Sequence, residues 1–285
     1  MTAPEPFGTR LRRAMDERGP LCVGIDPHPS LLAAWGLGDD VGGLERFADT
    51  VVEALAERVA VLKPQSAFFE RFGSRGVAVL ERTVAAARSA GALVLLDAKR
   101  GDIGSTMAAY AAAYLDEGAP LAADAVTVSP YLGYGSLRPA LDLARANGRG
   151  VFVLALTSNP EGAEVQSAVT AAGPTVAQGI LDRLREENAA ELAAGAPLGS
   201  FGAVVGATVG ETGAELAIGG PLLAPGVGAQ GATAADLPRV FGDTLGQVLP
   251  NVGRGVLKHG PHPAALRAAA EREAAEIARF LDSGA

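Results

Sequence analysis

The sequence predicts an α/β protein that folds as a (β/α)8, or TIM, barrel. Three observations support this prediction: the length of the chain, the recurrence of short apolar runs, and the helix-like segments between those runs. The 285 residues are 48% hydrophobic and can bury one large core. Barrels of this kind often form one domain at this length, so we expect a single domain over residues 1–285.

Eight short apolar runs predict the strands of the barrel. Their residues are apolar in succession rather than in alternation, which is typical of parallel strands that helices cover. In chain order, the predicted strands are 21–26, 59–65, 93–99, 125–131, 151–157, 202–208, 222–227 and 252–257. Regular alternation with helices predicts a parallel sheet, and eight units favour its closure. A doubly wound open sheet is the alternative that the same pattern allows.

The segments between the runs predict the helices. Residues 44–59 and 76–91 place apolar side chains at helical spacing. Residues 7–19 are expected to form a helix that closes the lower end of the barrel, and residues 263–284 the last outer helix. The stretch 160–199 is longer than a simple crossover, so we expect an extra helix or a mobile loop over the mouth of the barrel.

The charge balance narrows the choice of partner. The formal net charge is −8, whereas nucleic acids and anionic membranes attract basic surfaces. The first twenty residues lack the apolar core of a signal peptide, and no apolar run reaches the roughly 18 residues that span a bilayer. We therefore expect a cytoplasmic protein that binds neither nucleic acid nor membrane. The single cysteine, Cys22, is expected to be buried filler.

Charged residues stand where the first three predicted strands end. The first strand ends in Asp26, the second carries Lys63, and the third carries Asp97 and Lys99, with Asp102 soon after. In TIM barrels the active site lies at these strand ends. Because alternate residues of a strand share a face, Asp97 and Lys99 should point the same way. Burying one such charge alone costs several kcal/mol, so we expect a compact Lys-Asp-Lys-Asp array.

The use of lysine supports a role in proton transfer. Only three of the 24 basic residues are lysines, and two of them, Lys63 and Lys99, stand at neighbouring strand ends. A lysine ammonium can release its proton near neutral pH in a suitable environment, whereas a guanidinium group cannot. A structural ion pair is the alternative for Asp97 and Lys99 alone. The presence of Lys63, Asp26 and Asp102 favours catalysis.

A glycine-rich segment, residues 225–231, follows the predicted seventh strand, and Gly253 and Arg254 lie in the predicted eighth. The loops after strands 7 and 8 of this fold commonly bind phosphate. Glycines let backbone N–H groups approach the phosphate, and Arg254 can donate two parallel hydrogen bonds to it. The segment also fits G-x-G-x-x-G, but no acidic strand end follows about 20 residues later, which argues against a nicotinamide cofactor. A turn without a ligand is the alternative.

Together these motifs resemble the orotidine 5′-phosphate decarboxylase family. Residues 97–102, DAKRGD, are similar to its D-x-K-x-x-D signature. The segments GIDPHP, LKPQSAFFE, LLDAKRGDIGST, VTVSPYLG and APGVGAQGA follow in the family's order over nearly the whole chain, as in its longer bacterial branch. The resemblance implies conversion of orotidine monophosphate to uridine monophosphate and carbon dioxide in pyrimidine biosynthesis. No metal or organic cofactor is expected, since the sequence lacks their common motifs.

The resemblance also implies a role for each member of the charged array. Lys99 is the proton donor to the C6 carbanion, and Asp97, Lys63 and Asp102 complete the array. The implied substrate contacts are Asp26, Thr106, Ser129, Gly228, Gln230, Gly253 and Arg254.

The implied contacts divide by the part of the nucleotide that they meet. Asp26 and Thr106 would contact the ribose, Ser129 the pyrimidine, and Gln230 and Arg254 the phosphate. In the family, the residues that match Asp102 and Thr106 reach into the partner subunit's site, which implies a homodimer with shared sites. The resemblance gives no role to His28 or to residues 157–162.

Other functions stay open at this level. Hexulose-phosphate synthases and β-keto-acid decarboxylases resemble the same D-x-K-x-x-D scaffold and use magnesium. An aldolase that forms a Schiff base through Lys63 or Lys99 is a second alternative. A noncatalytic barrel that binds a phosphorylated nucleotide is a third, of a different class.

Overall fold

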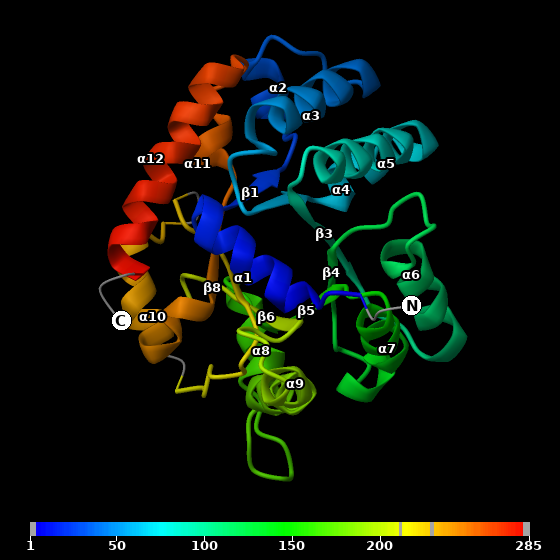
Figure 1. Cartoon of the computed structure of the whole chain (residues 1–285), viewed down its shortest axis with the longest axis vertical. Helices are drawn as coiled ribbons and strands as arrows, with labels where there is room; N and C mark the ends of the chain where they lie inside the picture. The colour runs from blue at the N-terminus through cyan, green and yellow to red at the C-terminus, as the bar shows by residue number, and fades with distance from the viewer. Residues whose placement is uncertain (1–3, 211–212, 229–230, 282–285) are drawn as a thin grey trace.

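The computed structural model describes residues 4–210, 213–228 and 231–281 (Figure 1). Within these residues, eight strands form a closed parallel barrel in which each strand pairs with its neighbours in sequence and β8 returns to pair with β1. The strands are β1 (Cys22–Ile25), β2 (Val61–Pro64), β3 (Leu93–Arg100), β4 (Ala125–Val128), β5 (Gly150–Leu156), β6 (Phe201–Val205), β7 (Leu222–Pro225) and β8 (Val248–Val252). The predicted (β/α)8 barrel is confirmed, and the open sheet is wrong.

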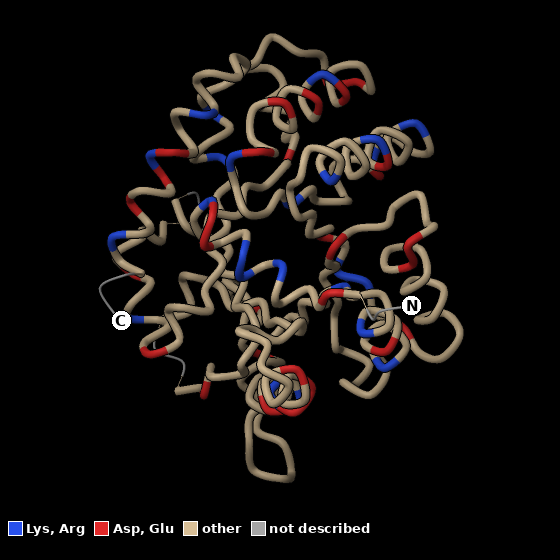
Figure 2. The backbone as a smooth tube through the Cα atoms, in the orientation of Figure 1, with Lys and Arg blue, Asp and Glu red and all other residues tan. Residues whose placement is uncertain are grey.

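Helices surround the barrel, and basic and acidic residues are interspersed along them (Figure 2). The α-helices are α1 (Phe7–Arg18), α2 (Pro29–Ala34), α3 (Val41–Leu55), α4 (Ser66–Glu70), α5 (Gly73–Ser89), α6 (Gly104–Leu115), α7 (Arg138–Ala146), α8 (Ala163–Gln166), α9 (Val176–Ala193), α10 (Leu237–Phe241), α11 (Arg254–Leu257) and α12 (Pro263–Leu281). Short 3-10 helices are η1 (Tyr134–Leu137), η2 (Pro160–Gly162), η3 (Ala234–Asp236) and η4 (Gly242–Gln247). In the described part of the chain, no helix combines the length and apolar character needed to cross a membrane.

Helix α1 closes the N-terminal end of the barrel. Its buried Phe7 and Leu11 belong to the apolar cluster that fills the barrel interior. Phe7 packs edge to face on Phe152 of β5, with ring centroids 6.0 Å apart. Gly150 permits this approach, because a Cβ there would lie 2.4 Å from the Phe7 ring. The prediction that residues 7–19 close the lower end is confirmed.

A second apolar cluster lies between the strands and the outer helices. Phe47 and Val51 of α3 and Leu80 of α5 are at most 1% exposed within it. Burying a side chain of this size stabilises the fold by about 1.5–3 kcal/mol. Helix α12 packs beside α3, which brings the last outer helix against the segment that follows β1 (Figure 1).

The eighth strand lies earlier than the sequence predicts. It covers Val248–Val252, whereas most of the predicted strand 252–257 forms the short helix α11. The error comes from Pro250, because proline has no N–H and is rare inside central strands. In the barrel, Pro250 is nevertheless in register with Ala224 of β7.

The long segment after β5 does contain an extra helical part. It forms η2 and α8, then a loop, then α9. An isolated antiparallel bridge joins Val169 to Thr175 across that loop, which projects from the barrel (Figure 1). The prediction of an extra helix within residues 160–199 is confirmed.

Candidate active site

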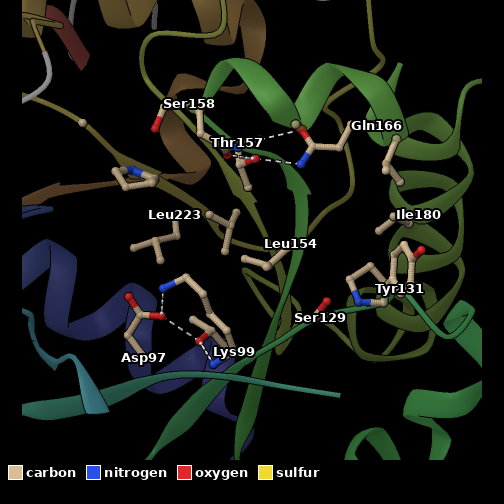
Figure 3. A pocket seen from close by; sticks show the side chains of 18 of the residues that line it. Asp97, Lys99, Ser129, Tyr131, Leu154, Thr157, Ser158, Gln166, Ile180 and Leu223 are labelled. Atoms are coloured by element: carbon tan, nitrogen blue, oxygen red, sulfur yellow. Dashed lines mark hydrogen bonds and ion pairs between the residues drawn. The ribbon is translucent and has the colours of Figure 1, made fainter. Parts of the chain in front are cut away.

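A pocket of about 1170 Å³ lies at the C-terminal ends of the strands (Figure 3). Charged side chains from β2 and β3, namely Lys63, Asp97 and Lys99, line one part of it. Apolar side chains, among them Leu154 of β5 and Leu223 of β7, line another part. Pockets for small ligands commonly measure about 300–1000 Å³, so this one has room for a nucleotide.

The charged side chains form a hydrogen-bonded series. Lys63 Nζ donates to Asp97 Oδ2 at 2.9 Å, and Lys99 Nζ donates to Asp97 Oδ1 at 2.6 Å. Lys63 is 3% exposed, whereas the Lys99 side chain is 45% exposed. Lys63 is therefore buried beside Asp97. Lys99 presents its ammonium group to the pocket (Figure 3).

Burial and charge oppose each other in this series. Burial alone would raise the pKa of Asp97, but Lys63 and Lys99 outweigh it and lower that pKa well below its usual range. Burial likewise disfavours the charged form of Lys63, yet the carboxylates of Asp97 and Asp26 raise the Lys63 pKa above its usual value. Lys63 and Asp97 are thus both ionised at neutral pH.

Asp26 lies directly after β1 and differs from Asp97. Its Oδ1 atom is buried, and in the described residues it has no hydrogen-bond partner. Burial and the nearby charge of Asp97 raise its pKa, while Lys63 opposes that shift. A buried acceptor without a donor is costly, and a ligand hydroxyl would satisfy it. Asp26 Oδ1 is therefore placed to accept a hydrogen bond from a ligand.

The loops after β7 and β8 reach another part of the pocket. Gly253 and Arg254 line it; Gly253 precedes α11 and Arg254 is the first residue of that helix. Gly228 is not among the described lining residues, and its N–H donates to Ala232 O at 2.6 Å. Gln230 lies outside the described residues. After β7, Gly226 and Val227 line the pocket, so residues from both loops border it.

Comparison with models of known protein families shows to which family the chain belongs. The model of the orotidine 5′-phosphate decarboxylase / HUMPS family matches residues 19–269. The chain belongs to this family. The match includes every predicted site residue, from Asp26 to Arg254.

Members of the family are similar to this chain over almost its whole length. An orotidine 5′-phosphate decarboxylase of Streptomyces coelicolor is 72% identical over 274 residues, which cover 96% of this chain and 97% of the relative. One from Salinispora arenicola is 69% identical over 278 residues, which cover 97% and 99%. A crystal structure from Streptomyces avermitilis has a TM-score of 0.95 and 69% identity, covering 99% of this chain and 98% of the other. The OMP decarboxylase of Leishmania donovani has a TM-score of 0.75 and 29% identity, with 97% and 99% covered.

Besides Gly228, two more of the residues that the family resemblance implies, Asp102 and Thr106, are not among the described lining residues. The Asp102 carboxylate accepts a hydrogen bond from the Ile103 N–H at 2.7 Å, and Thr106 is exposed on α6. Ser129, by contrast, lines the pocket (Figure 3). A single chain of this family member therefore brings together three members of the predicted Lys-Asp-Lys-Asp array but not the fourth.

Sequence reasoning misses several polar residues of the pocket. Thr127 on β4 has no signal in the sequence, because it is a lone threonine in an apolar strand. Thr157, just after β5, and Gln166, at the end of α8, are joined by two hydrogen bonds (Figure 3). They run from Thr157 N to Gln166 Oε1 at 2.9 Å and from Gln166 Nε2 to Thr157 Oγ1 at 2.7 Å. His28 packs on Phe68, with ring centroids 4.3 Å apart. All five residues line the pocket.

Proposed function

We propose that this chain decarboxylates orotidine monophosphate to uridine monophosphate and carbon dioxide, a reaction of pyrimidine biosynthesis. The observation that carries the proposal is the hydrogen-bonded series of Lys63, Asp97 and Lys99 in the pocket. The 72% identity to a decarboxylase of that name supports the choice of substrate. The cytoplasmic location expected from the sequence is part of the same proposal.

The proposed chemistry needs a cation and a proton at the reacting carbon. When the bond between C6 and the carboxylate breaks, carbon dioxide leaves and the electron pair stays on C6. The Lys99 ammonium, which faces the pocket, stabilises this charge and then donates its proton to form the new C–H bond. The resulting amine takes a proton from solvent. Preorganised charge of this kind is usually the largest electrostatic contribution to a rate.

Asp97 and Lys63 hold the donor in place. The 2.6 Å bond from Lys99 to Asp97 fixes the direction of the ammonium group before the substrate binds. Lys63 balances the Asp97 charge through the ion pair at 2.9 Å, with both side chains less than a tenth exposed. The same series could also repel the substrate carboxylate, but the mechanism does not require that effect.

The other pocket residues fit the remaining parts of the nucleotide. Arg254, at the loops after β7 and β8, would bind the phosphate together with Gly253, Gly228 and Gln230. The unsatisfied Asp26 Oδ1 would accept a hydrogen bond from a ribose hydroxyl. The Ser129 hydroxyl would meet the pyrimidine. Binding of the remote phosphate can then contribute to the chemical step.

An exposed apolar patch supports the proposal of a homodimer. Ile103, Tyr131 and Leu132 are 62%, 79% and 52% exposed. They lie on the connections β3–α6 and β4–η1, which meet where the Ser129 N–H donates to Arg100 O at 2.7 Å. Exposed apolar patches mark interaction surfaces. We assign this patch to a second copy of the chain.

The dimer would give Asp102 and Thr106 a role. Both lie near this patch in sequence and outside their own chain's pocket. In the proposed homodimer each would enter the other subunit's site, where Asp102 completes the charged array and Thr106 contacts the ribose. Each site would then need two subunits.

The test of the proposed function follows the ultraviolet absorbance of orotidine monophosphate with purified protein in a metal chelator. The expected result is rapid loss of the substrate signal and formation of uridine monophosphate. Activity that appears only with added magnesium would favour the phosphosugar enzymes of the same family. Trapping of protein-bound substrate by borohydride would indicate a Schiff-base aldolase, and binding without turnover a noncatalytic barrel.

A further inference from the structure

Thr127 stands at the centre of the charged series, although no role is given to it by the proposed chemistry. It is 1% exposed on β4 and lines the pocket. Its hydroxyl accepts a hydrogen bond from Lys99 N at 2.9 Å and donates one to Asp97 Oδ1 at 2.9 Å. The same Asp97 oxygen accepts from Lys99 Nζ at 2.6 Å. These three hydrogen bonds link Lys99 N, the Thr127 hydroxyl, Asp97 Oδ1 and Lys99 Nζ. The side chain of Lys99 itself closes them into a ring.

The backbone around Lys99 explains why the hydroxyl is needed there. In the pairing of β3 with β4, Leu96 is in register with Val126, but the next pair is Arg100 with Val128. Strand β3 thus carries extra residues at this point, and regular pairing with β4 is interrupted. The N–H of Lys99 bonds to the Thr127 side chain in place of a strand carbonyl.

The same interruption forces an unusual conformation on Lys99. Its φ is 47°, and within the described residues it is the one non-glycine residue with a positive φ. Side chains rarely adopt this region, and where they do, the surrounding structure must hold them there. The bond from Lys99 N to Thr127 is a contact that does so, and it lies at the residue that must present its ammonium to the substrate.

We propose that Thr127 is a positioning residue for the decarboxylation: its hydroxyl locks the irregular turn of β3 and orients Asp97, so that Lys99 Nζ stands at the reacting carbon. This proposal rests on the proposed function. Valine has the same branched shape as threonine but lacks the hydroxyl. The part of Thr127 that matters is therefore the hydroxyl, which donates its proton to Asp97 and accepts from Lys99 N with one of its two lone pairs.

Removing the Thr127 hydroxyl should change the position of Lys99 Nζ and leave the charge of Asp97 unchanged. Lys63 and Lys99 both lower the pKa of Asp97, so its carboxylate stays ionised without Thr127. The pH profile of kcat should then keep the same apparent pKa values, while the maximum kcat falls. Substrate binding should change little, because the proposed phosphate and ribose contacts lie on other residues.

The test compares Thr127→Val with wild type for kcat and KM on orotidine monophosphate, and for the Kd of uridine monophosphate. Loss of a hydrogen bond to a charged group predicts a kcat lower by roughly ten- to a hundredfold. KM and Kd should stay within about threefold of wild type, since only the reacting end is disturbed. Thr127→Ser, which keeps the hydroxyl, should recover most of the lost kcat. Thr83→Val is the matched control, because Thr83 is a buried threonine on α5, away from the pocket, whose hydroxyl donates to Val79 O of the same helix at 2.8 Å.

Several outcomes would overturn the assignment of Thr127. They are a wild-type kcat in Thr127→Val, a Thr127→Ser variant as slow as Thr127→Val, or a kcat loss matched by the Thr83→Val control. If Thr127→Val does not fold, Thr127→Ala must show the same selective loss of kcat, and normal turnover there contradicts the proposal. A wild-type protein that does not decarboxylate orotidine monophosphate would instead overturn the proposed function itself.

Discussion

Replacement of Asp97 by asparagine should destabilise the fold as well as the site. Asp97 accepts hydrogen bonds from Lys63, Lys99 and Thr127, and asparagine keeps its shape but not its charge. Lys63 is 3% exposed and would lose the carboxylate to which its ammonium donates at 2.9 Å. Asp26 would be the remaining carboxylate that favours the charged form of Lys63. The variant therefore leaves a buried cation with reduced compensation.

The expected size of the effect follows from that burial. Removing one partner of a buried ion pair costs about 3–5 kcal/mol, and Asp26 places the Asp97→Asn variant near the lower end. For a domain of this size, a loss of about 3 kcal/mol lowers Tm by roughly 6–12 °C. Adding Lys63→Met should restore part of this loss, because the double variant no longer buries the uncompensated ammonium.

Thermal unfolding of the single and double variants, followed by circular dichroism, measures both effects. The control is Asp182→Asn on α9, since Asp182 pairs with Arg185 at 3.0 Å and both side chains are about 40% exposed. A surface pair of that kind is worth less than about 1 kcal/mol, so Tm should fall by only a few degrees. A fall in the Asp97→Asn variant no larger than in the control, or no recovery with Lys63→Met, would refute the reasoning.

Three further predictions concern the phosphate site, the shared site and pH. Arg254→Ala should lower kcat/KM for orotidine monophosphate at least about a hundredfold, because charged hydrogen bonds to phosphate are lost. The control is Arg82→Ala, which removes an exposed ion pair with a glutamate on α3. Full activity of Arg254→Ala would show that Arg254 does not bind the phosphate. Mixing Lys99→Ala and Asp102→Ala subunits should restore activity, because one site of each heterodimer would be complete; no recovery in confirmed heterodimers counts against shared sites. Burial opposes the charged form of Lys63, but the neighbouring carboxylates raise the Lys63 pKa above its usual value. The ion pairs of Lys63 therefore stabilise the fold fully below the pKa of an unfolded lysine, about 10.4, and this stabilisation is lost as pH rises through the pKa of the folded state. Wild-type Tm should consequently fall more steeply than that of Lys63→Met above about pH 10.4, and parallel curves would contradict this sign.

The barrel could be predicted because its strands are short, apolar and separated by amphipathic segments. Residues at the ends of β2 and β3 could be predicted for the same reason: once the strands are placed, their C-terminal ends must meet. The eighth strand could not be placed, because Pro250 and Asn251 read as a turn when the pairing with β7 is unknown. Tertiary pairing overrides the local preference of those residues.

The limits within the site have a similar origin. Thr127 is one threonine between valines, and its importance depends on a register shift in β3 that no local pattern reveals. Asp102 and Thr106 belong to the motif in sequence but not to the pocket of one chain, because their proposed function needs a second copy. Residue types and their order could therefore be predicted from the sequence, whereas the backbone irregularity at Lys99 could not.

The most direct test of the account compares wild type with Lys99→Ala in the decarboxylation of orotidine monophosphate, with uridine monophosphate binding measured on both proteins. Loss of the cation and proton donor at C6 predicts a kcat lower by at least about a thousandfold. Uridine monophosphate should still bind, which would show that the pocket is intact. A Lys99→Ala variant that retains a kcat within about tenfold of wild type would contradict the claim that this lysine performs the chemistry.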